Sequence, residues 1–174
     1  GVFDATNGLL FFWAMQTTTL ALAVLTHYLA PVLVARSAPW VLGEKSDRRT
    51  IAALVVAFTG LVVLLEPWRG GDSAVGLGAL LGGGSALFFT ASLLVAKRLQ
   101  RHFAPTEILA WHLPTGIAVS LPFLPAGVAH TPRDALVLLL LAGLGPGALA
   151  GVLFIRGLAH TEANRASILM LLGQ

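Results

Sequence analysis

Residues 20–65 of the chain read LALAVLTHYLAPVLVARSAPWVLGEKSDRRTIAALVVAFTGLVVLL. Two apolar runs, each long enough to cross a bilayer, flank the short charged turn Gly43–Arg49. The first run contains His27, Pro31 and Arg36, whereas the second run carries no charge. This stretch predicts a transmembrane helical hairpin whose turn lies on the basic side of a membrane.

The composition of the whole chain agrees with that prediction. Of the 174 residues, 56% are hydrophobic and 11% are charged, whereas a soluble domain has about 25% charged residues. The net charge is +3, but the basic residues lie in short turns between apolar runs, so we exclude a nucleic-acid partner. The chain has no cysteine, which excludes disulfides, thiolate metal sites and a cysteine nucleophile. The expected surroundings are a lipid bilayer.

Apolar runs predict about seven full or partial helices in an all-α, polytopic transmembrane bundle. Proline is expected to kink the helices that contain Pro31, Pro114 and Pro146. Because the first and last apolar runs are short, we expect the chain to be a fragment of a longer membrane protein. The predicted helices span Gly8–Gln16, Leu20–Leu42, Arg49–Leu65, Val75–Leu99, Pro105–Ala126, Asp134–Ala159 and a segment that begins at Ala163.

The distribution of Lys and Arg predicts the orientation of these helices. If the Gly43–Arg49 turn is cytoplasmic, eight basic residues lie inside, two lie outside and Arg36 lies within the membrane, which accounts for all eleven. The opposite orientation would invert that ratio, so the positive-inside rule favours the first. The eight inside are Lys45, Arg48, Arg49, Lys97, Arg98, Arg101, Arg156 and Arg165, and the two outside are Arg69 and Arg133.

A weak internal repeat pairs residues 10–31 with residues 153–174. Five positions are identical in this alignment, among them Phe11 with Phe154 and Ala23 with Ala166. The two copies would leave the membrane on opposite sides. Such inverted-topology repeats are typical of secondary transporters.

The same stretch resembles a known family. The pattern A-P-V-L-V-A-x-x-A-P-x-x-L-G-E at residues 30–44, followed by TIAALVVAFTGLVVLL at residues 50–65, looks like the EamA-type transporters of the drug/metabolite transporter superfamily. Residues 92–98 and 151–169 are similar to the second half of that family. The resemblance covers nearly the whole chain, and it departs from the family at Arg36 and at the end of the chain.

The resemblance implies a ten-helix protein built from two inverted five-helix halves. Residues 1–66 would be the end of the first EamA repeat (helices 3 to 5), residues 67–74 a periplasmic linker, and residues 75–174 most of the second repeat, up to the start of helix 9. It also implies a multi-pass protein of the bacterial inner (plasma) membrane.

His27 and Tyr28 lie near the middle of the predicted membrane span, about one turn before Pro31. Ionisable groups within a membrane default to a functional hypothesis, so both residues are candidates for the wall of a substrate cavity. A hydrogen bond between helices is the alternative interpretation of His27 and Tyr28.

Arg36 is the second kind of candidate. Its side chain could snorkel to the cytoplasmic interface, or it could contact an anion or act in gating. Trp13, Trp111 and His112 are further candidates for substrate binding, with simple packing as the alternative.

These observations predict a secondary-active transporter, an exporter of small organic metabolites, amino acids or drugs, that works by alternating access. The chain lacks a phosphate-binding loop, a His-Glu-x-x-His zinc motif and a nucleophile elbow, so we expect no enzymatic activity, no cofactor and no metal. A non-transporting membrane scaffold, or a membrane enzyme with its catalytic residues outside this chain, is the alternative. Coupling to a proton and assembly as a homodimer stay open.

Overall fold

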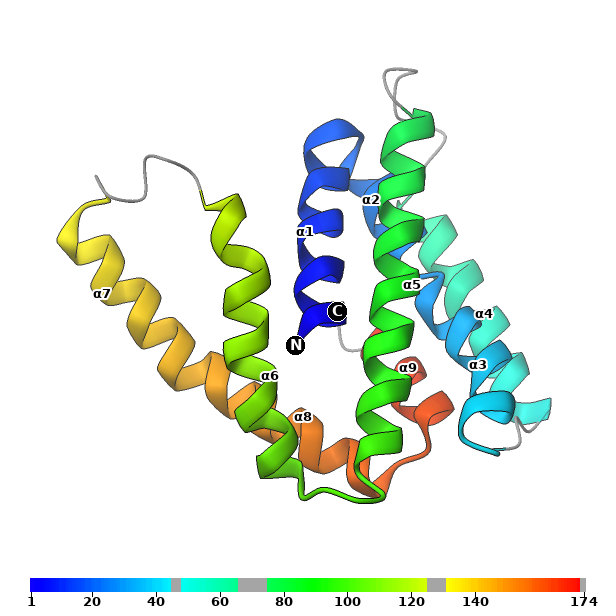
Figure 1. The fold of residues 1–174 in the computed structure, drawn as a ribbon. Coiled ribbons are helices and arrows are strands. Elements are labelled where there is room, and N and C mark those ends of the chain that lie inside the picture. The colour runs from blue at the N-terminus through cyan, green and yellow to red at the C-terminus, as the bar shows by residue number, and fades with distance from the viewer. Residues whose placement is uncertain (45–47, 66–74, 125–130, 173–174) are drawn as a thin grey trace.

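The computed structural model describes residues 1–44, 48–65, 75–124 and 131–172, and within these ranges the chain is all-α (Figure 1). The elements are α1 (Val2–Thr17), α2 (Leu20–His27), α3 (Ala30–Val41), α4 (Arg48–Leu65), α5 (Val75–Leu99), α6 (Pro105–Ser120), the 3₁₀ turn η2 (Leu121–Phe123), α7 (Arg133–Ala142), the π-helical turn η4 (Gly143–Gly147), α8 (Ala148–His160) and α9 (Ala163–Leu172). Two of the seven predicted helices are each divided into shorter elements, namely α2 and α3 in one and α7, η4 and α8 in the other.

The predicted helix Leu20–Leu42 corresponds to the apolar span Leu20–Val41, but the α-helix is interrupted at Tyr28 and Leu29 between α2 and α3. Pro31 occupies the first turn of α3, so it has no amide hydrogen to donate to the carbonyl of His27, one turn earlier. Leu29 instead bonds back to the Thr26 carbonyl at 3.3 Å, with the tighter spacing of a 3₁₀ turn. The predicted kink is therefore a local change of the helical hydrogen-bonding pattern over two residues within this span.

The predicted helix Asp134–Ala159 is interrupted as well. Its centre is the π-helical turn Gly143–Gly147, which contains Pro146. Proline cannot bond to the carbonyl four residues earlier, and a local widening of the helix accommodates that loss. α6 ends at Ser120 and not at Ala126, because the chain tightens into η2 around Pro122.

Other boundaries were predicted closely. α5 has the predicted bounds, α4 begins one residue early, and α9 begins at the predicted Ala163. α1 begins at Val2, six residues before the predicted Gly8. The predicted linker 67–74, with Arg69, lies outside the described residues.

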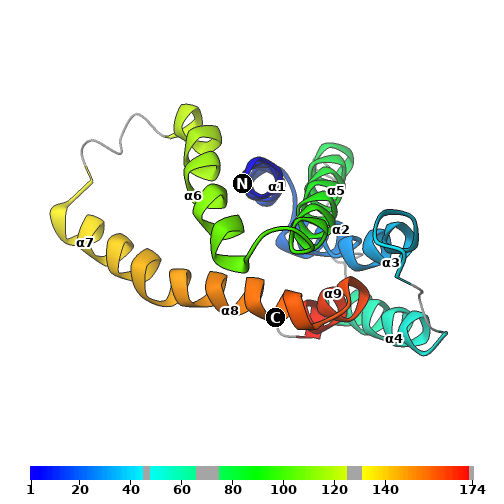
Figure 2. The same cartoon turned by 60° about the horizontal axis from the view of Figure 1, so that its bottom comes forward.

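Helix α1 lies between α5 and α6, and Figure 2 shows these three helices side by side. The α2–α3 segment packs on the other side of α5, and α9 packs against α3. α7 and α8 form one long diagonal segment that crosses α6 near its lower end (Figure 1). The largest buried cluster joins α3, α5, α8 and α9 through Val34, Ala38, Leu42, Leu93, Leu94, Leu158, Ala163 and Ala166.

Three segments are long and apolar enough to cross a membrane: Leu20–Val41, Gly76–Leu99 and Arg133–His160. Most side chains of α7 and α8 are exposed, including an unbroken row of leucines at residues 138–141. Such a surface is unfavourable in water and suits lipid or neighbouring helices. The chain is therefore a membrane helix bundle.

The helix boundaries follow the internal repeat. α1 ends at Thr17 and α2 begins at Leu20, and 143 residues later α8 ends at His160 and α9 begins at Ala163. This is the shift that pairs Phe11 with Phe154. The α1–α2 turn lies at the upper end of the bundle and the α8–α9 turn at the lower end (Figure 1). Two related helix pairs with opposite directions are what an inverted repeat predicts.

Candidate functional site

A cavity of about 540 Å³ lies between α1, α5 and α6. This volume is within the range of about 300–1,000 Å³ that sites for small organic molecules occupy. Aromatic side chains on its wall are Phe3, Phe103 and Trp111, and polar side chains are Ser92, Glu107, His112 and Thr115. The wall is thus mostly apolar with a few polar groups, which is the usual composition of a small-molecule site.

A smaller cavity of about 220 Å³ adjoins the first between α1, α5, α6 and α8. Ser92, Ala96 and His112 line both cavities. The smaller cavity adds Asp4 from α1 and Phe154 from α8. Helices from both halves of the chain therefore enclose two neighbouring cavities that share His112.

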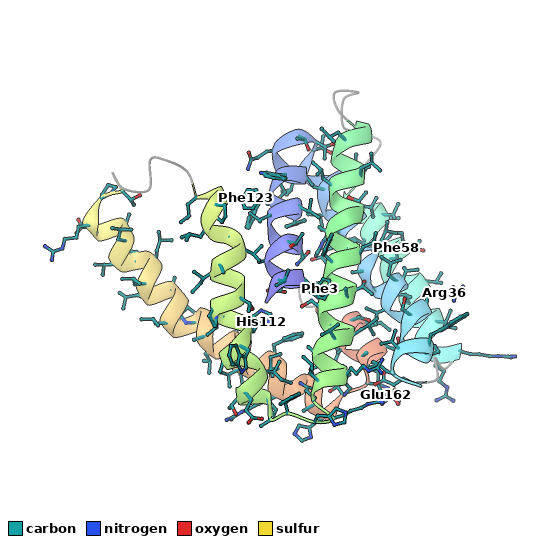
Figure 3. All side chains as sticks on the ribbon, in the orientation of Figure 1. Phe3, Arg36, Phe58, His112, Phe123 and Glu162 are labelled. Carbon is teal, nitrogen blue, oxygen red and sulfur yellow. The ribbon has the colours of Figure 1, made fainter. Side chains whose placement is uncertain are left out.

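His112 joins α6 to α1 at the centre of this region (Figure 3). Its Nε2 lies 3.2 Å from Oδ2 of Asp4, and both side chains are only partly buried, with exposed fractions of 27% and 47%. An imidazole held by a carboxylate has a fixed ring orientation, and the partly exposed carboxylate can still accept a hydrogen bond from a molecule in the cavity. Trp111, the next residue, lines the larger cavity but is 75% exposed, so it lies at the rim.

The structure places His27 elsewhere. Its Nδ1 lies 2.6 Å from Oγ of the buried Ser85 on α5, and its ring packs 4.6 Å from Phe11 and 5.7 Å from Phe89. Tyr28 is adjacent, with 5.7 Å between the two ring centroids. Neither His27 nor Tyr28 lines the two cavities. The contact of His27 with Ser85 matches the hydrogen bond between helices that the sequence left open, and a role for His27 and Tyr28 in substrate binding stays a prediction.

Trp13 and Arg36 also lie away from the cavities. The Trp13 ring meets Phe123 of η2 edge-on at 5.6 Å, which joins the upper ends of α1 and α6. The guanidinium of Arg36 lies 5.3 Å from the ring centroid of Trp40, and both side chains are exposed (Figure 3). A cation over an aromatic ring near a helix end is typical of a membrane interface. Substrate binding by Trp13 and gating by Arg36 stay predictions.

Sequence reasoning missed Asp4, Ser92 and Glu107. Asp4 could have been found, because it is a carboxylate inside an otherwise apolar helix, and such groups default to a functional hypothesis. Ser92 carried no local signal, and Glu107 is the expected acidic residue in the first turn of a helix. No cluster of three potential metal ligands occurs among the described residues.

The chain is similar to a known protein family and to several known proteins. The EamA-like transporter family matches residues 1–66 and 76–173. An uncharacterized transporter of Archaeoglobus fulgidus is 31% identical over 91% of the chain and 56% of its own length. A riboflavin transporter of Rhizobium johnstonii is 38% identical over 66% of the chain and 37% of its length, and an uncharacterized transporter of Bacillus subtilis is 22% identical over 99% of the chain and 56% of its length. The chain thus spans about half the length of these relatives or less, and no solved structure matches it.

Proposed function

Because the chain belongs to the EamA-like transporter family, we propose that the full-length protein is a secondary exporter of a small organic molecule. The cavity of about 540 Å³ between α1, α5 and α6 is the observation that supports this function best. It is large enough for a metabolite, and its wall combines apolar and polar groups as substrate sites do. No covalent chemistry is part of the proposal.

The wall of the cavity suggests the class of substrate. The charged side chains that line the two cavities are Glu107 and Asp4, and both are acidic. Aromatic rings from Phe3, Phe103 and Trp111 offer flat apolar contact. An amphipathic molecule with a ring system and hydroxyl or amine donors fits this lining. One relative is named a riboflavin transporter, so riboflavin is the first compound to test.

The ends of the helices support the proposed orientation. Lys97, Arg98 and Arg101 at the end of α5 lie at the same end of the bundle as Arg48 at the start of α4, whereas Arg133 lies at the opposite end (Figure 1). We call the former the basic end. A cytoplasmic basic end in a bacterial inner membrane follows from the positive-inside rule. Alternating access would then come from movement of residues 1–66 against residues 75–174.

The test is transport by the full-length protein in sealed vesicles. Riboflavin, amino acids and aromatic amines are supplied under proton, sodium and no gradient, and accumulation is measured. The substitution Trp111→Ala should reduce transport of the active compound about threefold or more, because an aromatic wall is lost. Trp40→Ala is the matched control, since Trp40 is 80% exposed and outside both cavities.

Absence of movement of any compound under every gradient would contradict the transporter function. Equal effects of Trp111→Ala and Trp40→Ala would instead show that the cavity is not part of the transport path.

A further inference from the structure

At the basic end, a carboxylate from the first repeat bonds to a helix of the second repeat. Oε2 of Glu44, just after α3, accepts a hydrogen bond of 2.8 Å from the backbone N–H of Ala163, the first residue of α9. The first amides of a helix have no partner within it, and the helix dipole favours an anion there. Glu44 therefore stabilises the start of α9 from 119 positions away in the chain.

Gly43 makes this contact possible. It has φ of +73°, a left-handed conformation that ends α3 and turns the chain toward α9. A side chain at Gly43 would meet no atom within 4 Å, so the backbone conformation and not space requires glycine there. The Gly-Glu pair at the turn of the opening stretch thus has two physical tasks, a helix stop and a contact between repeats.

Arg101 adds a second bond between the repeats at the same end. Its guanidinium donates to the backbone carbonyl of Leu42, at the end of α3. The second repeat is itself held together nearby, because Nζ of Lys97 donates to the carbonyls of Leu158 and Thr161 at 2.6 Å each. α5, α8 and α9 therefore form one unit, and Glu44 and Arg101 join α3 to it.

We propose that Glu44 and Arg101 form a basic-end gate, which closes this end of the transporter when bonded and must separate when the end opens. The proposal rests on the proposed alternating-access function. Both bonds cross between the parts that would move, and both lie beside the buried cluster of α3, α5, α8 and α9. Opening the basic end would expose this cluster, including Ala38, whose side chain is fully buried here.

The test measures access to that cluster without any substrate. Ala38→Cys is introduced in a full-length protein without other cysteines, and its reaction with a membrane-impermeant maleimide is timed from the basic side. Glu44→Ala and Arg101→Ala should each speed labelling about fivefold or more, because a charge-assisted hydrogen bond is lost from the closed state. Glu44→Gln, which keeps the size of the side chain and one acceptor, should give a smaller increase and serves if Glu44→Ala does not fold.

Two control substitutions remove the same charges at the same end. Among the described residues, the Glu162 side chain pairs only with Arg165, three positions later, at 3.4 Å. Both side chains are largely exposed, so Glu162→Ala should leave labelling unchanged. The side chain of Arg98 makes no ion pair or hydrogen bond with the described residues, so Arg98→Ala controls for Arg101→Ala.

Parental labelling rates in all three gate variants, or equal acceleration by the controls, would overturn the gate. The labelling needs no transport, so the two proposals fail separately. Faster labelling in a protein that moves no solute would retain the gate and reject the transporter. Transport of a solute together with unchanged labelling would retain the transporter function and reject the gate.

Discussion

A methyl group added at Gly82 should loosen the contact between α2 and α5. A Cβ atom built at Gly82 would overlap Oγ1 of Thr26, and it would lie 3.0 Å from Cβ of Thr26 and 3.1 Å from the backbone oxygen of Ala23. Ordinary carbon contacts are longer, so α2 and α5 can approach this closely only with glycine at position 82. Gly82→Ala therefore tests whether Gly82 serves the packing of α5 against α2.

The expected loss of stability in Gly82→Ala depends on which atoms near position 82 can move away from the added methyl group. Thr26 could rotate its hydroxyl away, but Oγ1 bonds to the carbonyls of Leu22 at 2.7 Å and Ala23 at 3.1 Å, and these bonds would be lost. The close contacts with Cβ of Thr26 and the Ala23 oxygen belong to or adjoin the backbone and would remain. Overpacking of this kind costs about 1–3 kcal/mol. At Gly83, where nothing lies within 4 Å, alanine should be neutral or stabilise by up to about 1 kcal/mol.

The assay is unfolding of the full-length protein in detergent micelles, followed by tryptophan fluorescence, for the parent, Gly82→Ala and Gly83→Ala. We expect Gly82→Ala to be the least stable, by about 1–3 kcal/mol relative to Gly83→Ala. Thr26→Ala in the Gly82→Ala background should recover part of the loss, because it removes the overlapping hydroxyl. Equal stability of the two alanine variants, or no recovery with Thr26→Ala, would refute the packing argument.

Three further predictions concern Gly43 after α3, His27 at the end of α2, and Asp4 in the smaller cavity. Gly43→Ala should lower the free energy of unfolding by about 1–2 kcal/mol in a denaturant titration, whereas Gly43→Asn should lose less, because asparagine tolerates positive φ. His27→Ala leaves the Oγ of buried Ser85 without its partner and should cost about 1–3 kcal/mol in the same titration, a loss that an exposed His27 would not produce. Asp4→Asn should weaken the hold on His112 and raise the transport KM of the active compound about threefold or more, and an unchanged KM would place this pair outside the substrate path.

Hydropathy predicted the helices well, because each span needs a long apolar run and each connection needs polar residues or glycine and proline. α5 shows this clearly. Its predicted bounds, Val75 and Leu99, are the observed ones, since a polar loop precedes the run and Lys97 and Arg98 lie in its last turn. Such boundaries depend on local composition, which a sequence displays directly.

The breaks were not predictable in the same way. Pro31 and Pro39 lie eight residues apart in the same apolar run, yet the chain is interrupted only before Pro31, and α3 continues through Pro39. A proline shows where a helical hydrogen bond is missing, but neighbouring helices decide how the chain responds. Near Pro31, Oγ1 of Thr90 on α5 approaches the Ala30 carbonyl at 3.4 Å, a contact 60 positions apart that no local pattern contains.

The candidate site was also predictable only in part from the sequence. Trp111 and His112 could be selected from the sequence because a tryptophan and a histidine beside a proline are unusual within an apolar run, and both line the larger cavity. Their partner Asp4 could not be assigned to them, because it lies 108 positions away on α1. A cavity formed by three helices is a property of their packing. A sequence can therefore supply candidates for its wall but cannot show which of them face one another.

The Gly-Glu pair at the turn of the opening stretch extends this argument. In the sequence, Gly43 and Glu44 contributed to the charged turn and to a family resemblance. In the structure, one residue has a left-handed backbone and the other bonds to the first amide of α9. Because α9 follows α8 as α2 follows α1 in the internal repeat, Glu44 bonds to the position in the second copy that matches Leu20, the first residue of the opening stretch. The turn of this hairpin thus bonds to the counterpart of the hairpin's first residue, and the bond joins the two copies of the internal repeat.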